Sequence, residues 1–401
     1  MNRNWKKDIV LFLSSQTISL FGSSLVQYAI MWYVTMNTQS GVMMTVYIIC
    51  GFLPTFFLSP FAGVWADRYD RKKLIILADS AIALATLILA IVFMSGYREM
   101  WLLFVVAAIR ALGAGVQTPA VGAFLPQIVP EDKLTKANAA NGSIQSIIML
   151  VSPMISGALL TKASIVTIFF IDIVTAFIGI SILVIFLRVE AHKKALENSD
   201  LSYFEDMLRG LAYIKGHHYV RNFFIFCAIF FFLFTPAAFL TPLQVTRSFG
   251  NDVWRLTAIE ITFSIGMILG GIIMASWGGF KNRVYSMAFS SFVSAGCTIA
   301  LGIVPSFYIY LMFMGIFGVV MPMFNTPSTV LLQEKVEPDY LGRVFGVFGM
   351  ISSSMMPLGM LVFGPIADMI KIEYLLIGTG SLLFILSFFL IKNKSLVNNG
   401  V

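Results

Sequence analysis

The sequence predicts an all-α membrane protein, with twelve transmembrane helices arranged as two pseudo-symmetric six-helix halves. Hydrophobic residues make up 58% of the 401 residues and charged residues only 12%, whereas soluble domains carry roughly 25% charged residues. A soluble fold of this size could not cover so much apolar surface with a polar skin. The apolar residues also gather into runs as long as a bilayer is thick, and short motifs of the first half recur in the second.

Twelve apolar runs are candidate transmembrane helices, because about 20 apolar residues in a helix cross the hydrocarbon core of a bilayer. An even number of spans predicts that both termini lie on the same side of the membrane. The runs occupy residues 9–36, 41–66, 74–95, 101–126, 137–160, 165–188, 219–245, 255–277, 284–304, 306–332, 341–366 and 372–391.

The basic residues predict which side of the membrane is cytoplasmic. The loops that share a side with the termini hold 21 Lys and Arg residues, and the opposite loops hold five. Cytoplasmic loops carry the excess of positive charge, so we expect a multi-pass protein of the cell membrane with both termini in the cytoplasm. The net charge of +7 then reflects topology, and no nucleic-acid partner is expected.

A polar stretch divides the chain. Residues 189–218 are predicted to be a cytoplasmic linker between an N-terminal six-helix bundle, 1–188, and a C-terminal one, 219–401. Whether the linker forms an amphipathic helix on the membrane or a solvated chain stays open. Two six-helix repeats are the layout of a carrier that alternates access to a site between its halves. The repeated motifs are Thr118-Pro119 with Thr326-Pro327, Pro130 with Pro338, and Trp65 and Arg71 with Trp277 and Arg283.

The loop between the second and third runs carries the sharpest motif, GVWADRYDRKK at 63–73. Its pattern of Gly, Asp, Arg and a basic cluster resembles the signature loop of the major facilitator superfamily. The resemblance implies that Gly63, Asp67, Arg68 and Arg71 form a latch that holds the cytoplasmic side shut, with Asp67 and Arg71 as the charged pair. The family usually has Gly where this chain has Asp70, and Asp tolerates a left-handed turn. The second copy, at 277–283, lacks the Asp, so we expect one strong latch.

Arg110 is the basic residue that falls inside a run, near the bilayer midplane. A charge there costs at least ~2.5 kcal/mol to insert, so it needs a polar cavity or a partner. The segment RALGAG resembles the fourth-span motif of drug:proton antiporters, which ties Arg110 to proton coupling; a structural Arg bonded to carbonyls is the alternative. Three carboxylates within runs, Asp79, Asp172 and Glu260, are candidate proton carriers, and the sequence does not choose between them.

Polar residues at helical spacing mark two faces that lipid would not solvate. Gln16 and Gln27 lie on the first run, and Asn141 and Gln145 on the fifth. They are candidates for the lining of a substrate cavity, with helix packing as the alternative. The segment SPMISG at 152–157 resembles a motif that drug antiporters carry in the fifth span and that accompanies export.

At a finer level the chain resembles the macrolide-efflux (Mef-type) branch of this superfamily. The resemblance implies export of macrolide-like or other lipophilic and amphiphilic compounds in exchange for protons, with no cofactor and no enzymatic activity. No Walker A motif is present in the sequence, which argues against direct drive by ATP, and no metal-ligand spacing is found. The stretches that carry the resemblance are GFLP at 51–54, DRYDRKK at 67–73, TPAVGA at 118–123, EITFSIGMILGG at 260–271 and EPDYLGRVF at 337–345.

Two other functions stay open at this stage. An exporter of siderophores or other metabolites would share the fold, and an anionic substrate would favour contact with Arg110. A membrane subunit that assists an ATP-driven pump without transporting would also share the composition. For either kind of exporter, the expected partners are the lipid bilayer, protons and a small lipophilic molecule. For the non-transporting subunit, an ATP-driven pump is an additional partner.

Overall fold

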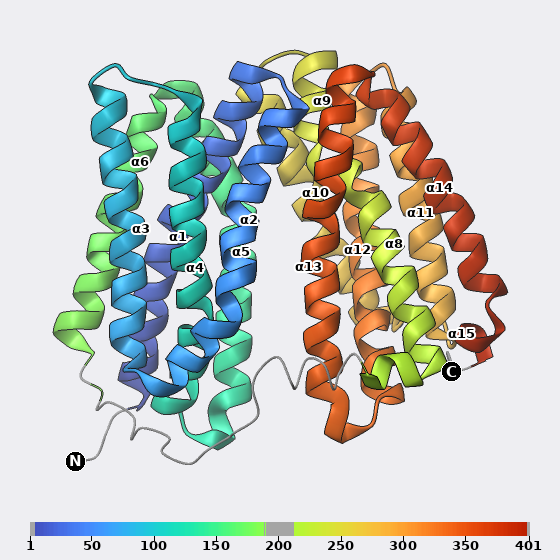
Figure 1. Ribbon diagram of the computed structural model, residues 1–401, viewed down its shortest axis with the longest axis horizontal. Helices are drawn as coiled ribbons and strands as arrows, with labels where there is room; N and C mark the ends of the chain where they lie inside the picture. The colour runs from blue at the N-terminus through green and yellow to red at the C-terminus, as the bar shows by residue number, and fades with distance from the viewer. Residues whose placement is uncertain (1–4, 188, 190–211, 399–401) are drawn as a thin grey trace. The chain divides into compact units, whose positions relative to one another are not determined.

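The computed structural model describes residues 5–187, 189 and 212–398, and every regular element in this part of the chain is helical (Figure 1). Within residues 5–187 and 212–398, twelve helices are long and apolar enough to cross a membrane, which confirms the predicted number and the all-α class. The predicted linker lies mostly outside the described residues. The protein is therefore a multi-pass membrane protein.

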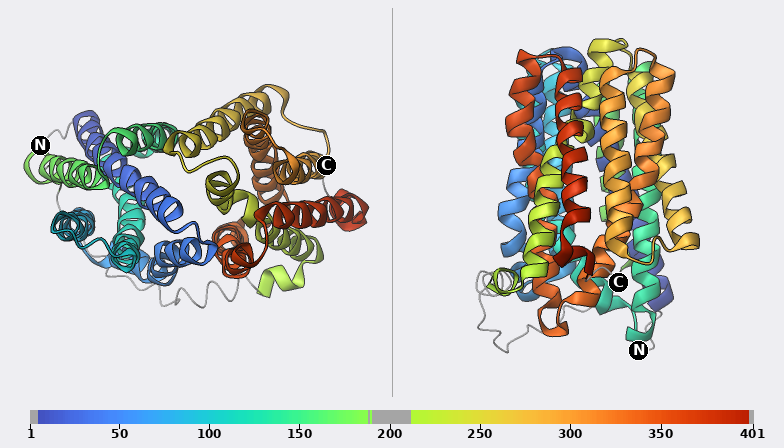
Figure 2. Two further views of the ribbon diagram at one scale, coloured as in Figure 1. Left: turned by 90° about the horizontal axis from the view of Figure 1, so that it is seen from above. Right: turned by 90° about the vertical axis from the view of Figure 1, so that its right-hand side faces the viewer.

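The chain divides into two compact units. The N-terminal unit holds Met1–Asn37 and Val46–Asn198, and the C-terminal unit holds Ser199–Val401 together with the turn Thr38–Thr45. Each unit is a bundle of helices with roughly parallel axes (Figure 2). The short turn Thr38–Thr45 thus packs with the second unit although its neighbours in sequence belong to the first.

In the N-terminal unit, α3 packs against both α4 and α6. Its helices are α1 (Trp5–Thr38), α2 (Gly41–Arg68), α3 (Arg71–Met94), α4 (Met100–Ile128), the short 3-10 helix η1 (Glu131–Lys133), α5 (Leu134–Lys162), α6 (Ile165–Ser181) and the π-helical turn η2 (Ile182–Phe186).

The C-terminal unit differs from the sequence prediction at one span. The run 219–245 forms one of the twelve spans, but it consists of two helices, α8 and α9, with a break at Leu240. Pro242 in the first turn of α9 has no backbone N–H with which to continue the hydrogen bonds of α8. The helices are α8 (His218–Phe239), α9 (Thr241–Ser248), α10 (Val253–Trp277), α11 (Arg283–Ile303), α12 (Phe307–Lys335), α13 (Pro338–Met369), α14 (Ile372–Lys392) and α15 (Lys394–Asn398).

Glycines hold α10 and α12 together at the level of their backbones. A Cβ added at Gly266 would lie 2.3 Å from the carbonyl oxygen of Gly315, and one added at Gly270 would lie 2.0 Å from that of Val319. Only residues without a side chain permit this approach. The two helices therefore form a tightly packed pair.

Two apolar cores occupy the two ends of the N-terminal unit. One contains Leu25, Phe93 and Phe169, and the other contains Phe12, Phe124 and Leu183. Between these cores, α1, α3 and α6 carry buried polar side chains, among them Gln16, Asp79 and Asp172. The packing of the bundle thus places a polar layer at mid-depth between two apolar ends.

The turn before α3 differs from the conformation considered for Asp70. Asp70 has φ −62° and ψ 110°, which is extended and not left-handed, and its carboxylate accepts hydrogen bonds from the backbone N–H groups of Lys72 and Lys73. Aspartate is a preferred N-cap residue because it satisfies such donors. The Asp that replaces the family's Gly therefore caps α3.

Candidate functional site

A buried ion pair joins α4 to α6. Nη1 of Arg110 lies 2.6 Å from Oδ2 of Asp172; the Asp172 side chain is fully buried, and 11% of the Arg110 side chain is exposed. Burying either charge alone would cost several kcal/mol. The sequence required a partner for Arg110 and left its identity open, and the structure pairs it with Asp172.

Two hydroxyl residues complete the hydrogen bonds of this pair. Thr86 of α3 accepts from Nη1 of Arg110 (2.6 Å) and donates to Asp172 (3.1 Å). Ser23 of α1 donates its hydroxyl to Asp172 (3.3 Å), and its carbonyl accepts from Nη2 of Arg110 (3.0 Å). Residues from four helices therefore converge on one charged centre, which fixes the orientation of the guanidinium.

Glycines allow the four helices to come this close. A Cβ added at Gly22 of α1 would lie 1.9 Å from the hydroxyl of Thr175 and 3.0 Å from Cα of Asp172. A Cβ added at Gly113 of α4 would lie 2.5 Å from Cγ1 of Ile82. The small-residue run after Arg110 thus brings α4 onto α3, and Gly22 brings α1 onto α6.

A cavity of about 210 Å³ opens beside Arg110. Apart from Arg110, its wall is apolar along α3 and α4 and carries polar groups from α1 and α2, so it can hold the apolar body of a small molecule next to a fixed charge. The Tyr47 hydroxyl on this wall donates to the carbonyl of Gln27 (2.9 Å). The lining residues are Ser23, Gln27, Ile30, Tyr47, Gly51, Thr55, Ile82, Ala107, Arg110, Ala111 and Ala114.

A second polar cluster surrounds Asp79 of α3, which is 3% exposed. Nε2 of Gln117 donates to Oδ1 of Asp79 (2.6 Å) and contacts Oε1 of Gln16 (3.4 Å). Oδ2 of Asp79 and Nε2 of Gln16 are buried without a hydrogen-bond partner among the residues that the structure describes. A buried polar atom without a partner costs free energy, so this carboxyl group has an open position that a proton would fill.

The two clusters form separate layers with a regular spacing. Gln16 precedes Ser23, and Asp79 precedes Thr86, by seven residues each, while Gln117 follows Arg110 by seven. Seven residues are about two helical turns, or roughly 10 Å of rise. We call the layer with the Arg110–Asp172 pair the upper layer and the layer with Asp79 the lower layer. The carboxyl group of Asp79 has no counter-charge among its described neighbours.

Glu260 lies apart from both layers, on α10 of the C-terminal unit. Its side chain is half-buried and makes no hydrogen bond or ion pair with any residue that the structure describes. Its backbone belongs to the tightly packed α10–α12 pair. Of the three candidate carboxylates, Asp172 is ion-paired, whereas Asp79 and Glu260 have no ion pair within the described part of the chain.

The latch residues lie at the junction of α2 and α3. Nε and Nη1 of Arg71 donate to the carbonyls of Ala66 and Ala123, both at 2.9 Å, and so tie α3 to the ends of α2 and α4. Gly63 has open space around it, and Arg68 is exposed. The side chain of Asp67 lies outside the described residues, so its pairing with Arg71 stays a prediction.

The corresponding position of the second half is also tied to a fourth helix. Arg283, at the start of α11, makes two hydrogen bonds to the carboxylate of Glu334 near the end of α12, at 2.6 and 3.1 Å. The sequence analysis showed that the second copy of the loop motif lacks the Asp, but it did not identify Glu334, 51 residues after Arg283, as the acidic partner. Each half therefore has an Arg that anchors its third helix to its fourth.

The cavity candidates separate into different environments. Gln27 lines the cavity beside Arg110, whereas Gln16 is buried in the Asp79 cluster. Asn141 is half-buried and Gln145 exposed on α5, and neither lines that cavity.

Sequence reasoning missed two residues of the layers, Thr86 and Gln117. Each is a polar residue inside an apolar run, seven residues from a charged residue already singled out. That register was the available signal, because side chains two turns apart share a helix face.

Comparison with known proteins identifies the family. The model of the Major Facilitator Superfamily matches residues 9–360. The chain belongs to this superfamily. It is therefore a transporter and not an enzyme, and it needs no cofactor.

Relatives with known names share nearly the whole length of the chain. The macrolide efflux protein A of Streptococcus pyogenes is 31% identical over 95% of this chain and 94% of its own. The staphyloferrin A transporter of Staphylococcus aureus is 25% identical, with 96% of each chain covered. Among solved structures, the nucleoside transporter NupG superposes with a TM-score of 0.70 at 17% identity, covering 97% of this chain and 98% of that one. This last likeness supports the fold alone.

Proposed function

We propose that this superfamily member is a secondary active efflux transporter that exports macrolide-like or other lipophilic and amphiphilic compounds in exchange for protons. The observation that carries the proposal is the buried Arg110–Asp172 pair beside a mostly apolar cavity. A charge held at mid-depth in the bilayer is costly and marks a substrate or ion pathway. The similarity to macrolide efflux protein A over nearly the whole chain supports the direction of transport and the substrate class.

Substrate contact is assigned to the cavity beside Arg110. Its volume of about 210 Å³ is smaller than the roughly 300–1,000 Å³ of drug pockets, so it receives only part of a bulky molecule. Ile30, Ile82 and the alanines of α4 supply apolar contact. The basic amine of a macrolide would compete with Arg110 for Asp172, and that exchange would link substrate binding to the ion pair.

Proton carriage is assigned to Asp79, with Glu260 as the second candidate. Asp172 already has a counter-charge, whereas Oδ2 of Asp79 has no partner. In the proposed cycle Asp79 takes up a proton from outside and releases it inside, as the upper layer binds and releases substrate. The roughly 10 Å between the layers lets the two events occur on different groups.

The orientation follows from the distribution of basic residues. Both termini and the 63–73 loop are assigned to the cytoplasm, and the protein to the cell membrane. The two six-helix halves would then alternate access by rocking, with Asp67 and Arg71 latching the cytoplasmic side.

The test uses purified protein in liposomes that contain a pH-sensitive dye. Adding a macrolide should release protons from the lumen or take them up, according to orientation, in proportion to transport. Asp79→Asn should abolish transport driven by a pH gradient and retain downhill exchange of substrate, because the amide mimics the neutral acid. Asp252→Asn, a change at a half-exposed loop carboxylate, is the matched control and should behave as the unaltered protein.

The alternatives give different results in the same liposomes. An exporter of anionic siderophores would move an anionic substrate and ignore a macrolide. A non-transporting partner of an ATP-driven pump would move neither compound without the pump. If gradient-driven transport survives in Asp79→Asn but is lost in Glu260→Gln, Glu260 and not Asp79 is the proton carrier.

A further inference from the structure

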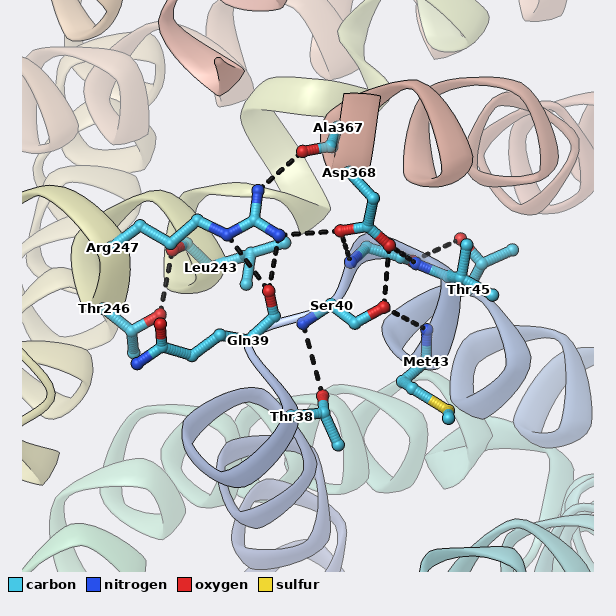
Figure 3. A network of polar contacts seen from close by, with 12 residues as sticks. Thr38, Gln39, Ser40, Met43, Thr45, Leu243, Thr246, Arg247, Ala367 and Asp368 are labelled. Carbon is cyan, nitrogen blue, oxygen red and sulfur yellow. Dashed lines mark hydrogen bonds and ion pairs between the residues drawn. The ribbon is translucent and has the colours of Figure 1, made fainter. Parts of the chain in front are cut away.

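The turn between α1 and α2 is held by charged residues from the other end of the chain. The carboxylate of Asp368, near the end of α13, accepts from the backbone N–H of Gly41 (2.7 Å), from the N–H of Val42 (3.0 Å) and from the hydroxyl of Ser40 (2.7 Å). Figure 3 shows these bonds meeting on one side chain. The first turn of α2 is thus capped by a residue more than 320 positions away in sequence.

Arg247 of α9 completes the arrangement. Its Nη2 donates to Asp368 (2.7 Å) and to the carbonyl of Gln39, its Nε donates to the same carbonyl (3.0 Å), and its Nη1 donates to the carbonyl of Ala367 (2.6 Å) (Figure 3). One guanidinium therefore binds both the turn and the end of α13. Charge-assisted hydrogen bonds of this kind are about twice as strong as neutral ones.

The backbones of the turn and of α13 are in direct contact. A Cβ added at Gly41 would lie 2.2 Å from the carbonyl oxygen of Gly364, and one added at Gly364 would lie 1.8 Å from the hydroxyl of Thr45. That hydroxyl also donates to the carbonyl of Met360 (3.0 Å). The chain is built for close approach at this position.

The conformation of the turn and the position of Asp368 both carry a local cost. Gln39 has φ +45°, a left-handed conformation that residues other than glycine seldom adopt. Asp368 stands at the C-terminal end of a helix, where the macrodipole disfavours an anion. Neither the left-handed Gln39 nor the anion at the end of α13 stabilises its own segment. Together they direct the carbonyl of Gln39 toward Arg247 and the carboxylate of Asp368 toward the start of α2.

We propose that Arg247, Asp368 and the turn Thr38–Thr45 form a clasp that holds the turn against α9 and α13 in one stage of the transport cycle and releases it in another. The inference rests on the proposed alternating-access function. The turn is continuous with α1 and α2, so its release from α9 and α13 would free the ends of both helices that join it. The predicted latch at Asp67 lies at the other end of α2, so one helix would be held alternately by its two ends.

The clasp is suited to repeated opening because water can replace its bonds. The side chains of Arg247 and Asp368 are 29% and 26% exposed, and both line a cavity of about 720 Å³. When the turn leaves, Arg247 and Asp368 still pair with each other, so neither charge is stranded. A fully buried pair would not allow this.

The closing experiment measures access to Thr45, which is 5% exposed beneath the clasp. In a variant with Cys50, Cys227 and Cys297 replaced by alanine, Thr45→Cys is reacted with a membrane-impermeant maleimide in the membrane-embedded full chain. Asp368→Asn should raise the labelling rate at least about tenfold, the change expected from losing one charge-assisted hydrogen bond. Asp252→Asn, which removes a separate ion pair of the same unit, should leave the rate within about twofold.

Equal labelling of the two variants would overturn the clasp. If Asp368→Asn does not fold, Arg247→Gln is measured in the same way, and an unchanged rate there has the same consequence. A second experiment combines Ser40→Cys with Asp368→Cys, so that oxidation can form a disulfide between the turn and α13. This variant should lose transport on oxidation and recover it on reduction. Full transport by the oxidised protein would show that the turn need not leave α13. The labelling arm needs no substrate, so it reads the clasp even if the proposed substrate class is wrong.

Discussion

Replacing Arg110 with methionine tests the ion pair of the upper layer most directly. Arg110→Met removes the counter-charge of a fully buried Asp172. Breaking a buried pair from one side typically costs 3–5 kcal/mol. The lower end of this range, about 3 kcal/mol, is expected here, because the hydroxyls of Ser23 and Thr86 still donate to the carboxylate.

The size of the loss in unfolding free energy distinguishes a buried ion pair from an exposed one. Lys133 and Asp132 lie 2.8 Å apart with side chains 48% and 68% exposed, and such surface pairs contribute about 0–1 kcal/mol. Lys133→Met is therefore the matched control. The free energy of unfolding is measured by urea titration in detergent, with helical circular dichroism as the signal.

A double variant separates stability from transport. Arg110→Met combined with Asp172→Leu leaves no charge buried, and replacing a buried pair by apolar residues is often neutral. We expect the double variant to recover most of the lost stability and to stay inactive in transport. A loss in Arg110→Met no larger than in Lys133→Met would refute the energetic reasoning, and wild-type transport by the double variant would refute the assignment of the site.

Four further outcomes are expected. Asp67→Asn should impair transport while expression and the free energy of unfolding stay unchanged. Transport is compared in liposomes with matched amounts of protein, and full activity would show that Asp67 is not part of a latch. In a cysteine-free variant an impermeant thiol reagent should label Tyr97→Cys from outside but not Tyr69→Cys, both exposed loop positions, and the reverse would invert the topology. Glu260→Gln should spare gradient-driven transport if Asp79 carries the proton, as proton flux in liposomes will show. Gly22→Ala should lower the unfolding free energy by about 1–3 kcal/mol, the usual cost of overpacking, since its methyl group would meet a hydroxyl 1.9 Å away; no loss would mean that α1 and α6 separate easily.

The membrane spans could be predicted from sequence because the bilayer sets their length. Predicted and observed ends differ by a few residues; the run 74–95, for example, corresponds to Arg71–Met94. The break at Leu240 was not predicted because the run 219–245 is long and apolar enough to be read as one span, and only Pro236 and Pro242 marked it.

Pairing between helices was harder to predict than the helices themselves. The position of Arg110 inside an apolar run showed that it needed a partner, but three carboxylates also lay within such runs. The choice of Asp172 depends on which helices touch, and that is decided by glycines such as Gly22 and Gly113. Asp368 was not singled out at all, since a lone acidic residue at the end of an apolar run is unremarkable until its partners are known.

The matching arginines at the start of α3 and α11 have a consequence for how the chain is made. Arg71 binds carbonyls of α2 and α4, and Arg283 binds a carboxylate of α12, so each contact lies within four consecutive helices. Domains generally fold as units while synthesis continues. The first of these contacts can form once α4 has entered the membrane, long before the second half leaves the ribosome. Each half of the protein thus contains a contact of this kind that can form without the other half.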